Sequence, residues 1–400
     1  ARLRRAAFFV CYARNTMRPR VVLSLGNFFF ALFSTALTYI IVPYLFSFMS
    51  EVSAGLVIAA GALVSCIVFP FLPRIVARYG AQQLAIIIAI LEMLSLLALA
   101  AVPNALSVSV FASMAIALGP FLAYQLDLLL EATVAEEGVT GRVRTIFLTA
   151  WNVAALAAPL LMGALLASRD AYHLVFIASA AATVPFIILF AARKLPPGTP
   201  PLLSHVKDTA QCMVRDRDLA AVTFGHFLLY LFFSWAPFYT PLYLHEIIGI
   251  PWSDLGWIFA VMLVPYVLIE YPAGILADKV IGDKEMMFIG YILAGASFAA
   301  ISLFTQNTPL ILILAVLVTS RAGAALVESM TEGHFFRRVS EKDVNSISVF
   351  RGIWPVANLV APVAASIILL FGNYPLFFAL TGGFIASAGV TSTLLIKDFR

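Results

Sequence analysis

Charged residues are scarce in this chain. Asp, Glu, Lys and Arg make up 12% of its 400 residues, whereas hydrophobic residues make up 62%. An average soluble domain carries about 25% charged residues. A soluble chain of this length could not cover its surface with so little polarity. The composition therefore excludes an ordinary globular protein and indicates an integral membrane protein.

The residues and motifs that usually mark catalytic or metal centres are also missing. Three cysteines, Cys11, Cys66 and Cys212, show no paired spacing, and the five histidines are not clustered. We therefore expect neither a disulfide framework nor a metal site. The sequence has no Gly-x-x-x-x-Gly-Lys-[Ser/Thr], no His-Glu-x-x-His and no Gly-x-Ser-x-Gly. An enzyme, a bound cofactor and ATP-driven work are accordingly not expected.

The sequence does contain twelve long apolar stretches. Each reaches the roughly 20 residues that a helix needs to cross the hydrocarbon core of a bilayer. Most connections between them are short, so consecutive helices are expected to be antiparallel neighbours. The stretches cover residues 21–48, 53–78, 83–102, 105–131, 145–167, 172–192, 219–246, 254–277, 286–304, 308–335, 345–370 and 374–396.

Positive charge between the stretches falls almost entirely on alternate connections. Only Arg169 lies in a connection on the opposite side, while Arg321 and Arg351 fall inside stretches. Positively charged loops stay in the cytoplasm, so both termini should be cytoplasmic in a multi-pass protein of the cell's inner (plasma) membrane. Because the basic residues are spread over short loops beside lipid headgroups, we expect the bilayer as a partner and no nucleic acid.

The chain consists of two related halves. They are separated by a connection with four prolines between residues 196 and 201 and a polar run that ends at Asp218. Residues of the first half recur 199 to 203 positions later: Gly26, Phe33, Gly80, Trp151 and Pro159 as Gly225, Phe232, Gly282, Trp354 and Pro362. A duplicated six-helix unit is typical of transporters with a central site between the repeats.

These observations predict four segments. They are a basic amphipathic cytoplasmic arm (1–20), an N-terminal six-helix bundle (21–193), a cytoplasmic linker (194–218) and a C-terminal six-helix bundle (219–400).

One loop resembles the signature of the major facilitator superfamily. Residues 274–285 read GILADKVIGDKE, which is similar to the family's Gly-x-Leu-Ala-Asp-[Arg/Lys] motif between the second and third helices of a six-helix unit. The equivalent loop of the first half keeps Arg78 and Gly80 but has Pro73 and Ala77 at the glycine and aspartate positions. The resemblance implies an all-α integral membrane protein with 12 transmembrane helices in two pseudo-symmetric six-helix bundles, and we expect a monomer.

In the resembled loops, Gly274, Asp278, Lys279 and Arg78 are candidates for a gate. A glycine lets helices approach closely, and a carboxylate at a helix end can cap a neighbouring helix or pair with a basic residue. Such a latch would form when the cytoplasmic side closes. The alternative is an ordinary helix end, in which Asp278 and Lys279 mark the boundary with water.

The fifth stretch carries a run that resembles the family's antiporter motif. It extends from Ala154 through Pro159 to Gly163, with alanines at most glycine positions. Small residues four apart allow tight helix packing, and the proline bends the helix. A similar run around Pro362 in the second half leaves general packing open as the alternative.

In the resembled fold, the first, fourth, seventh and tenth helices line a central cavity, and their polar residues are candidates for binding substrate. For some of these residues packing is the alternative: hydroxyls can bond to their own helix, a tryptophan can anchor at the interface and a histidine can be a satisfied core residue. The candidates are Asn27, Thr35, Tyr39, Tyr124, His226, Tyr230, Trp235 and Arg321.

Charges inside the membrane are functional candidates because they are costly to bury. Asp127 and Glu270, one in each half, are placed to carry protons, since burial and approaching cations shift a carboxyl between its two forms. Glu328 and Arg351 fall at similar depth on successive helices and are expected to form a structural ion pair.

Taken together, the sequence predicts a secondary active transporter that works by alternating access on a small organic solute and protons. Thirty-three Phe and few cavity charges favour efflux of an amphiphilic solute by proton antiport. The alternative is proton-coupled uptake of an organic anion, held by Arg321, or of another small metabolite. An intramembrane lipid-handling protein is the less favoured third possibility.

Overall fold

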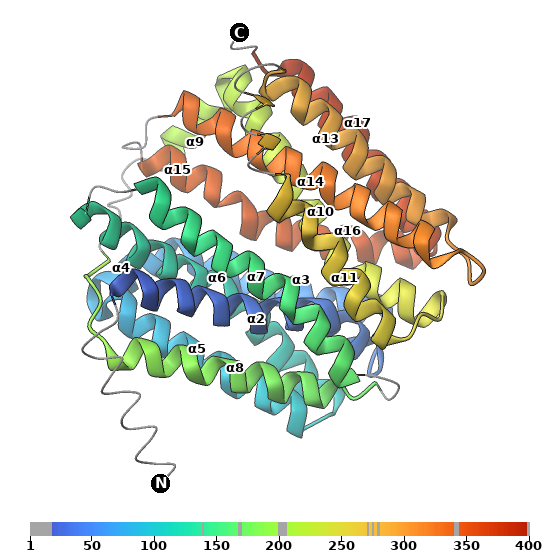
Figure 1. Ribbon diagram of the computed structural model, residues 1–400, viewed down its shortest axis with the longest axis horizontal. Coiled ribbons are helices and arrows are strands. Elements are labelled where there is room, and N and C mark those ends of the chain that lie inside the picture. Colours follow the sequence, from blue (N-terminus) through green and yellow to red (C-terminus); the bar gives the residue numbers. More distant parts are fainter. Residues whose placement is uncertain are drawn as a thin grey trace. The chain divides into compact units, whose positions relative to one another are not determined.

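The structure is a computed structural model, and its described part consists of helices and their connections (Figure 1). It describes residues 18–137, 140–166, 170–198, 206–269, 272–273, 276–277, 281–339 and 344–397.

Among the described residues of the first half there are seven α-helices: α2 (Pro19–Phe46), α3 (Glu51–Val68), α4 (Leu72–Tyr79), α5 (Ala81–Ala101), α6 (Ala105–Glu137), α7 (Thr140–Leu166) and α8 (Tyr172–Ala192). The second half contains α9 (Val206–Arg215), α10 (Arg217–Leu242), α11 (Trp252–Leu268), α13 (Asp283–Ala300), α14 (Leu310–Arg338), α15 (Val344–Arg351), α16 (Ile353–Phe371) and α17 (Tyr374–Leu395). Short turns η1 (Phe69–Phe71), η2 (Tyr243–Ile247) and η3 (Ile301–Leu303) extend α3, α10 and α13.

Eleven helical segments of the described part are long and apolar enough to cross a membrane. They correspond to eleven of the twelve stretches predicted from the sequence. The remaining stretch, 254–277, begins as α11, which has 17 residues. Because several residues after Ile269 lie outside the described part, the twelfth span stays a prediction.

Several helices continue through an internal proline, including α2, α6, α7, α8 and α16. In water a proline breaks a helix, because it lacks an N–H group and clashes with the preceding turn. In a bilayer the backbone has no water to bond with, so helix is retained and neighbouring groups satisfy the freed carbonyl.

The chain divides into two compact units. One contains Ala1–Met49 and Ala60–Leu202, and the other contains Ser50–Ala59 and Leu203–Arg400. The division at residue 202 falls within the predicted linker, but the first residues of α3 group with the second unit. The predicted six-helix bundles with boundaries at 193 and 219 therefore stay a prediction.

In the first unit, α2 packs against α6, α7 and α8. The side-chain amide of Asn27 donates to the carbonyl of Phe147 on α7 over 2.9 Å. The hydroxyl of Tyr44 donates to the carbonyl of Leu99 on α5 over 2.7 Å. These bonds connect backbone groups of neighbouring helices through buried side chains, so they fix the depth of α2 relative to α5 and α7.

In the second unit, α13 lies between α14 and α17 (Figure 1). Small residues bring the backbones together: a Cβ atom on Gly295 would lie 2.7 Å from the carbonyl oxygen of Gly382 on α17. A Cβ on Gly323 of α14 would lie 2.6 Å from the carbonyl oxygen of Gly290. No substituent fits at these contacts, which is how small residues allow close helix packing in membranes.

Two glycines paired by the sequence repeat have the same local geometry. Gly80 and Gly282 have φ angles of 82° and 96°, and each directly precedes a helix, α5 and α13. Residues with a side chain rarely adopt a positive φ, so glycine is the residue that turns the chain into these helices without strain.

Candidate functional site

A buried cation lies near the middle of α14. Arg321 is 3% exposed, and its guanidinium carbon is 4.9 Å from the ring centre of Phe232 on α10. None of the ion pairs between described residues involves Arg321. A cation over a desolvated aromatic ring gains about 2 kcal/mol, which is less than the usual cost of burying a charge in a membrane. This arrangement is suited to receive an anion.

A buried histidine connects α10, α14 and α15. His226 stacks on Phe350, with ring centres 4.0 Å apart, and meets Tyr230 edge-on at 4.7 Å. Its Nδ1 lies 3.4 Å from the hydroxyl oxygen of Thr331. Since that hydroxyl donates to the carbonyl of Val327 over 2.8 Å, we assign the imidazole proton to Nδ1. Nε2 is then a buried acceptor, with no hydrogen-bond partner among the described residues.

Beside His226, four half-buried aromatic side chains contact one another, and we call them the aromatic row: Tyr230, Phe233, Tyr266 and Trp354. They come from α10, α11 and α16. Tyr230 lies 5.9 Å from Phe233 and 6.4 Å from Trp354, and Phe233 lies 6.0 Å from Tyr266, between ring centres. Rings at such distances present polarisable faces and edges to a ligand that is partly apolar.

Trp235 is part of the packing of the second unit. Its indole N–H donates to the carbonyl of Ala361 on α16 over 2.7 Å, and its ring meets Phe377 of α17 edge-on. Tyr239, one turn further along α10, also lies against Phe377, at 4.9 Å. The structure thus places Trp235 where it joins α10 to α16, and its contact with substrate stays a prediction.

The candidates of the first unit lie on α2 and α6. Asn27 and Tyr39 are buried, while Thr35 is half-buried. The side-chain amide of Asn27 donates its hydrogen bond to the carbonyl of Phe147, as described above. Tyr124 of α6 is half-buried and meets Phe69 edge-on at 5.4 Å. Its hydroxyl is buried and has no hydrogen-bond partner in the described chain, and its contact with substrate stays a prediction.

The predicted proton carriers are placed only in part. Asp127 is exposed on α6, one turn before Glu131, which is also exposed. Gln125, two residues earlier, is fully buried, and its amide finds no partner among the described residues. Glu270 lies outside the described residues, so the structure does not place the second carrier.

Of the predicted gate, the structure places only Arg78. Gly274, Asp278 and Lys279 lie outside the described residues. Arg78 is exposed at the end of α4, with its guanidinium carbon 5.4 Å from the ring centre of its neighbour Tyr79.

A group of charges missed by the sequence analysis lies where α10 and α13 begin and α14 ends. We call it the charge network: Asp216, Asp218, Asp283, His334, Arg337 and Arg338. His334 lies between two carboxylates, 3.3 Å from Asp218 and 3.6 Å from Asp283. Arg337 pairs with Asp283 at 3.1 Å, and Arg338 with both Asp216 and Asp218 at 3.0 Å. Acids at helix N-termini and bases at a C-terminus also match the helix dipoles.

Asp216 is the N-cap of α10. Its carboxylate accepts from the amides of Asp218 at 3.0 Å and Leu219 at 3.3 Å. Limited burial raises the pKa of this carboxyl, but the hydrogen bonds from Leu219 and Asp218 and the charges of Arg338 and Lys397 outweigh it. The pKa of Asp216 is therefore below its ordinary value, and the group is charged at neutral pH.

Arg351 forms an ion pair with Glu332. Arg351 donates to that carboxylate over 2.8 Å, and both side chains are about a third exposed. Glu332 lies one turn beyond Glu328 on α14. The predicted pair of Glu328 and Arg351 stays a prediction, while Arg351–Glu332 joins α14 to α15.

Comparison with known proteins gives one family. The model of the Major Facilitator Superfamily matches residues 23–253 and 222–398. No curated protein matches the chain.

Three solved structures with a similar fold illustrate the likeness. A mutant of the nucleoside transporter NupG shares 11% identity, with 95% of this chain and 100% of that one covered and a TM-score of 0.80. A D-xylose-proton symporter shares 15% identity, with coverage of 94% and 95% and a TM-score of 0.72. A POT family transporter in complex with a thioalcohol-conjugated peptide shares 14% identity, with coverage of 93% and 94% and a TM-score of 0.73. At these identities the likeness concerns the fold.

Proposed function

Because the chain belongs to the major facilitator superfamily, and is thus a transporter rather than an enzyme, we propose that it exports a small amphiphilic organic solute in exchange for protons. It works as a monomer in the inner (plasma) membrane, with both termini in the cytoplasm. The solute is bound and released by alternating access.

The aromatic row is the observation that carries this proposal. Its four half-buried rings come from three helices and can contact the apolar part of one solute. The row continues to His226, whose Nε2 can accept a hydrogen bond from the solute's polar end. The row itself contains no charged residue, so its rings suit the apolar part of an amphiphilic solute.

Proton coupling is assigned to Asp127 and Glu270. Asp127 is exposed on α6 and lies toward the predicted cytoplasmic end of its span, where proton exchange with water would take place. Uptake of a proton neutralises the carboxylate, and the neutral form can enter a less polar environment at lower cost. The latch of Gly274, Asp278, Lys279 and Arg78 would close the cytoplasmic side after the solute has bound and before it is released.

Proton-coupled uptake of an organic anion is the second candidate, and Arg321 favours it. A guanidinium cannot shed its proton at physiological pH and binds carboxylate or phosphate through two parallel hydrogen bonds. Its described neighbours supply an aromatic ring and no ion pair. An anionic solute would provide the missing counter-charge.

Flux in proteoliposomes tests both candidates. With a pH gradient imposed, wild-type protein should drive cationic dyes against the proton flux, whereas an anion symporter would accumulate organic anions with it. Asp127→Asn or Glu270→Gln should abolish gradient-driven transport and leave downhill exchange partly intact. Glu246→Gln, which neutralises an exposed carboxylate beyond α10, is the control. Full accumulation by both carrier variants would place coupling elsewhere.

A further inference from the structure

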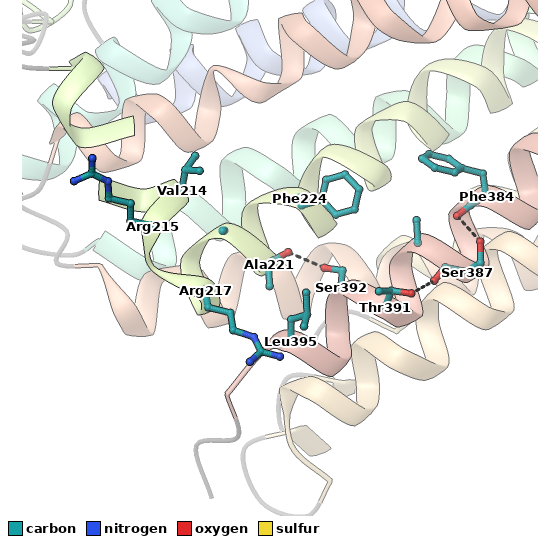
Figure 2. A pocket seen from close by; sticks show the side chains of 12 residues that line it. Val214, Arg215, Arg217, Ala221, Phe224, Phe384, Ser387, Thr391, Ser392 and Leu395 are labelled. Atoms are coloured by element: carbon teal, nitrogen blue, oxygen red, sulfur yellow. Dashed lines mark hydrogen bonds between the residues drawn. The ribbon is translucent and has the colours of Figure 1, made fainter. Parts of the chain in front are cut away.

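A groove lies between α10 and α17, near the start of α10 (Figure 2). Its volume is about 730 Å³. Small residues on both helices open it: Ala220 and Ala221 on α10, and Ser387 and Ala388 on α17. The two helices meet at its floor, where the hydroxyl of Ser392 donates to the carbonyl of Ala221 over 2.7 Å.

The walls of the groove are effectively apolar. Phe224, Phe384 and Leu395 line it and are each well exposed. The hydroxyls in the walls are used within the chain: Ser387 donates to the carbonyl of Gly383 and Thr391 to that of Ser387, at 2.7 and 2.8 Å. A polar solute would find no free donor along these walls, whereas a hydrocarbon chain would lose nothing by lying there.

One end of the groove is positively charged. Arg215 and Arg217 lie at this end, and Figure 2 shows Phe224 and Phe384 further along. No residue that lines the groove is acidic. Neither arginine takes part in an ion pair with a described residue, and Asp216 between them is engaged by Arg338. The two side chains are exposed and extend in different directions from this end of the groove in Figure 2, and together they make the end attractive to an anion.

The length of the groove matches one leaflet. At a rise of 1.5 Å per residue, Phe384 lies about 16 Å along α17 from Leu395. Half of a hydrocarbon core of about 30 Å is about 15 Å. Arg217 begins the membrane span of α10, which is the depth at which lipid phosphates lie.

We propose that this groove is a binding site for one anionic phospholipid. The charges of Arg215 and Arg217 attract the phosphate to this end of the groove, and one acyl chain lies between α10 and α17 along Phe224 and Phe384. The occupant is a lipid because the groove joins an anion-binding end to an apolar channel that a free phosphate would leave empty.

Lipid retention by the purified protein tests the proposal. Native mass spectrometry would count phosphatidylglycerol and phosphatidylcholine bound after detergent exchange, and titration would give their affinities. Wild-type protein should retain more phosphatidylglycerol than phosphatidylcholine. Each arginine near a headgroup contributes about 1 kcal/mol, so Arg215→Gln with Arg217→Gln should weaken binding about thirtyfold. Lys194→Gln with Lys207→Gln removes two exposed charges outside the groove and should change little.

A second variant tests the acyl chain. Ala388→Phe should fill the groove and lower retention while both arginines remain, whereas Leu380→Phe, exposed on α17 outside the groove, should not. Equal retention of the two lipids, equal losses in the arginine and lysine variants, or wild-type retention by Ala388→Phe would each overturn the proposal. So would displacement of phosphatidylglycerol by millimolar inorganic phosphate alone. Because both arginines are exposed, their substitution leaves the fold intact, which size-exclusion chromatography verifies.

Discussion

Nε2 of His334 lies 3.3 Å from both carboxylate oxygens of Asp218, and both side chains are almost completely buried. The same carboxylate accepts from the backbone amide of Lys397 over 2.7 Å and lies 3.0 Å from Nε of Arg338. A buried charge is tolerated only when it is paired and hydrogen-bonded. Asp218 therefore joins the start of α10 to the end of α14 and to the chain after α17.

Asp218→Ala is expected to destabilise the protein by about 3–5 kcal/mol, because it leaves buried partners without their counter-charge. Thermal unfolding in detergent measures this loss. Lys397→Ala is the matched control: the contact uses its backbone amide, so stability should change by less than about 0.5 kcal/mol. Similar stability of the two variants would show that the network contributes little.

Alanine is expected to affect stability differently at two adjacent glycines of α17. A Cβ on Gly382 would lie 2.6 Å from the carbonyl oxygen of Gly295, whereas a Cβ on Gly383 would meet nothing within 4 Å. Gly382→Ala should cost about 1–3 kcal/mol by overpacking. Gly383→Ala should be neutral or stabilise by up to about 1 kcal/mol, since alanine is the better helix former. Only Gly382→Ala should melt at a lower temperature than wild type; an equal decrease in both variants would contradict the close packing of α13 and α17.

The contribution of Asp216 to folding stability should depend on pH. Its folded-state pKa is lowered, so its charge stabilises the fold above the ordinary pKa, and this contribution is lost as the pH falls through the lowered value. Asparagine also caps helices, so Asp216→Asn removes the charge alone. The difference in stability from wild type should be under about 1 kcal/mol at neutral pH, because the pair with Arg338 is partly exposed. It should disappear once the pH has fallen below the lowered pKa of Asp216, whereas a difference that persists in stronger acid would have another cause.

Arg321 is expected to bind solute. Arg321→Ala and Arg321→Lys should both lose affinity while remaining folded, since lysine cannot reproduce the planar, bidentate guanidinium. Equilibrium binding and thermal unfolding should be measured together. If alanine lowers stability and lysine restores both stability and binding, the arginine has a structural role. Normal transport by Arg321→Ala would remove it from the site.

Cys212 offers a native probe of topology. It is exposed on α9, which the predicted orientation places in the cytoplasm. With Cys11 and Cys66 replaced by serine, a membrane-impermeant maleimide should label Cys212 only after the cells are permeabilised. Cysteines introduced at Asn104 or Asn373 should react in intact cells. Strong labelling of Cys212 in intact cells would reverse the orientation.

The sequence predicts the helices well where hydropathy alone determines them. The predicted stretch 172–192 coincides with α8, and 374–396 ends one residue beyond α17. The stretch 345–370, in contrast, is divided into α15 and α16 at Gly352. Pro355 has no N–H group to bond to the carbonyl of Arg351 four residues earlier, so one hydrogen bond of a continuous helix is missing at this break. A hydropathy profile contains no information about a missing backbone hydrogen bond.

The charge network was missed for a different reason. Asp218, Asp283 and His334 lie at the ends of apolar stretches, where a sequence analysis expects charges to contact water. Their burial depends on three helix ends meeting, and the depth of a residue along one helix contains no information about the neighbouring helices. The Asp-x-Asp before α10 and the His-x-x-Arg-Arg that ends α14 are the signals that could have indicated it, through the helix dipoles.

The glycine contacts of α13 have a consequence for hydration. Gly290 meets Gly323 on one side, and Gly295 meets Gly382 on the other, so backbone lies against backbone on two faces of one helix. No water molecule fits into such a contact. A carbonyl of α13 that leaves its intrahelical bond therefore has no solvent to replace it, and opening this helix requires α14 and α17 to separate from it first.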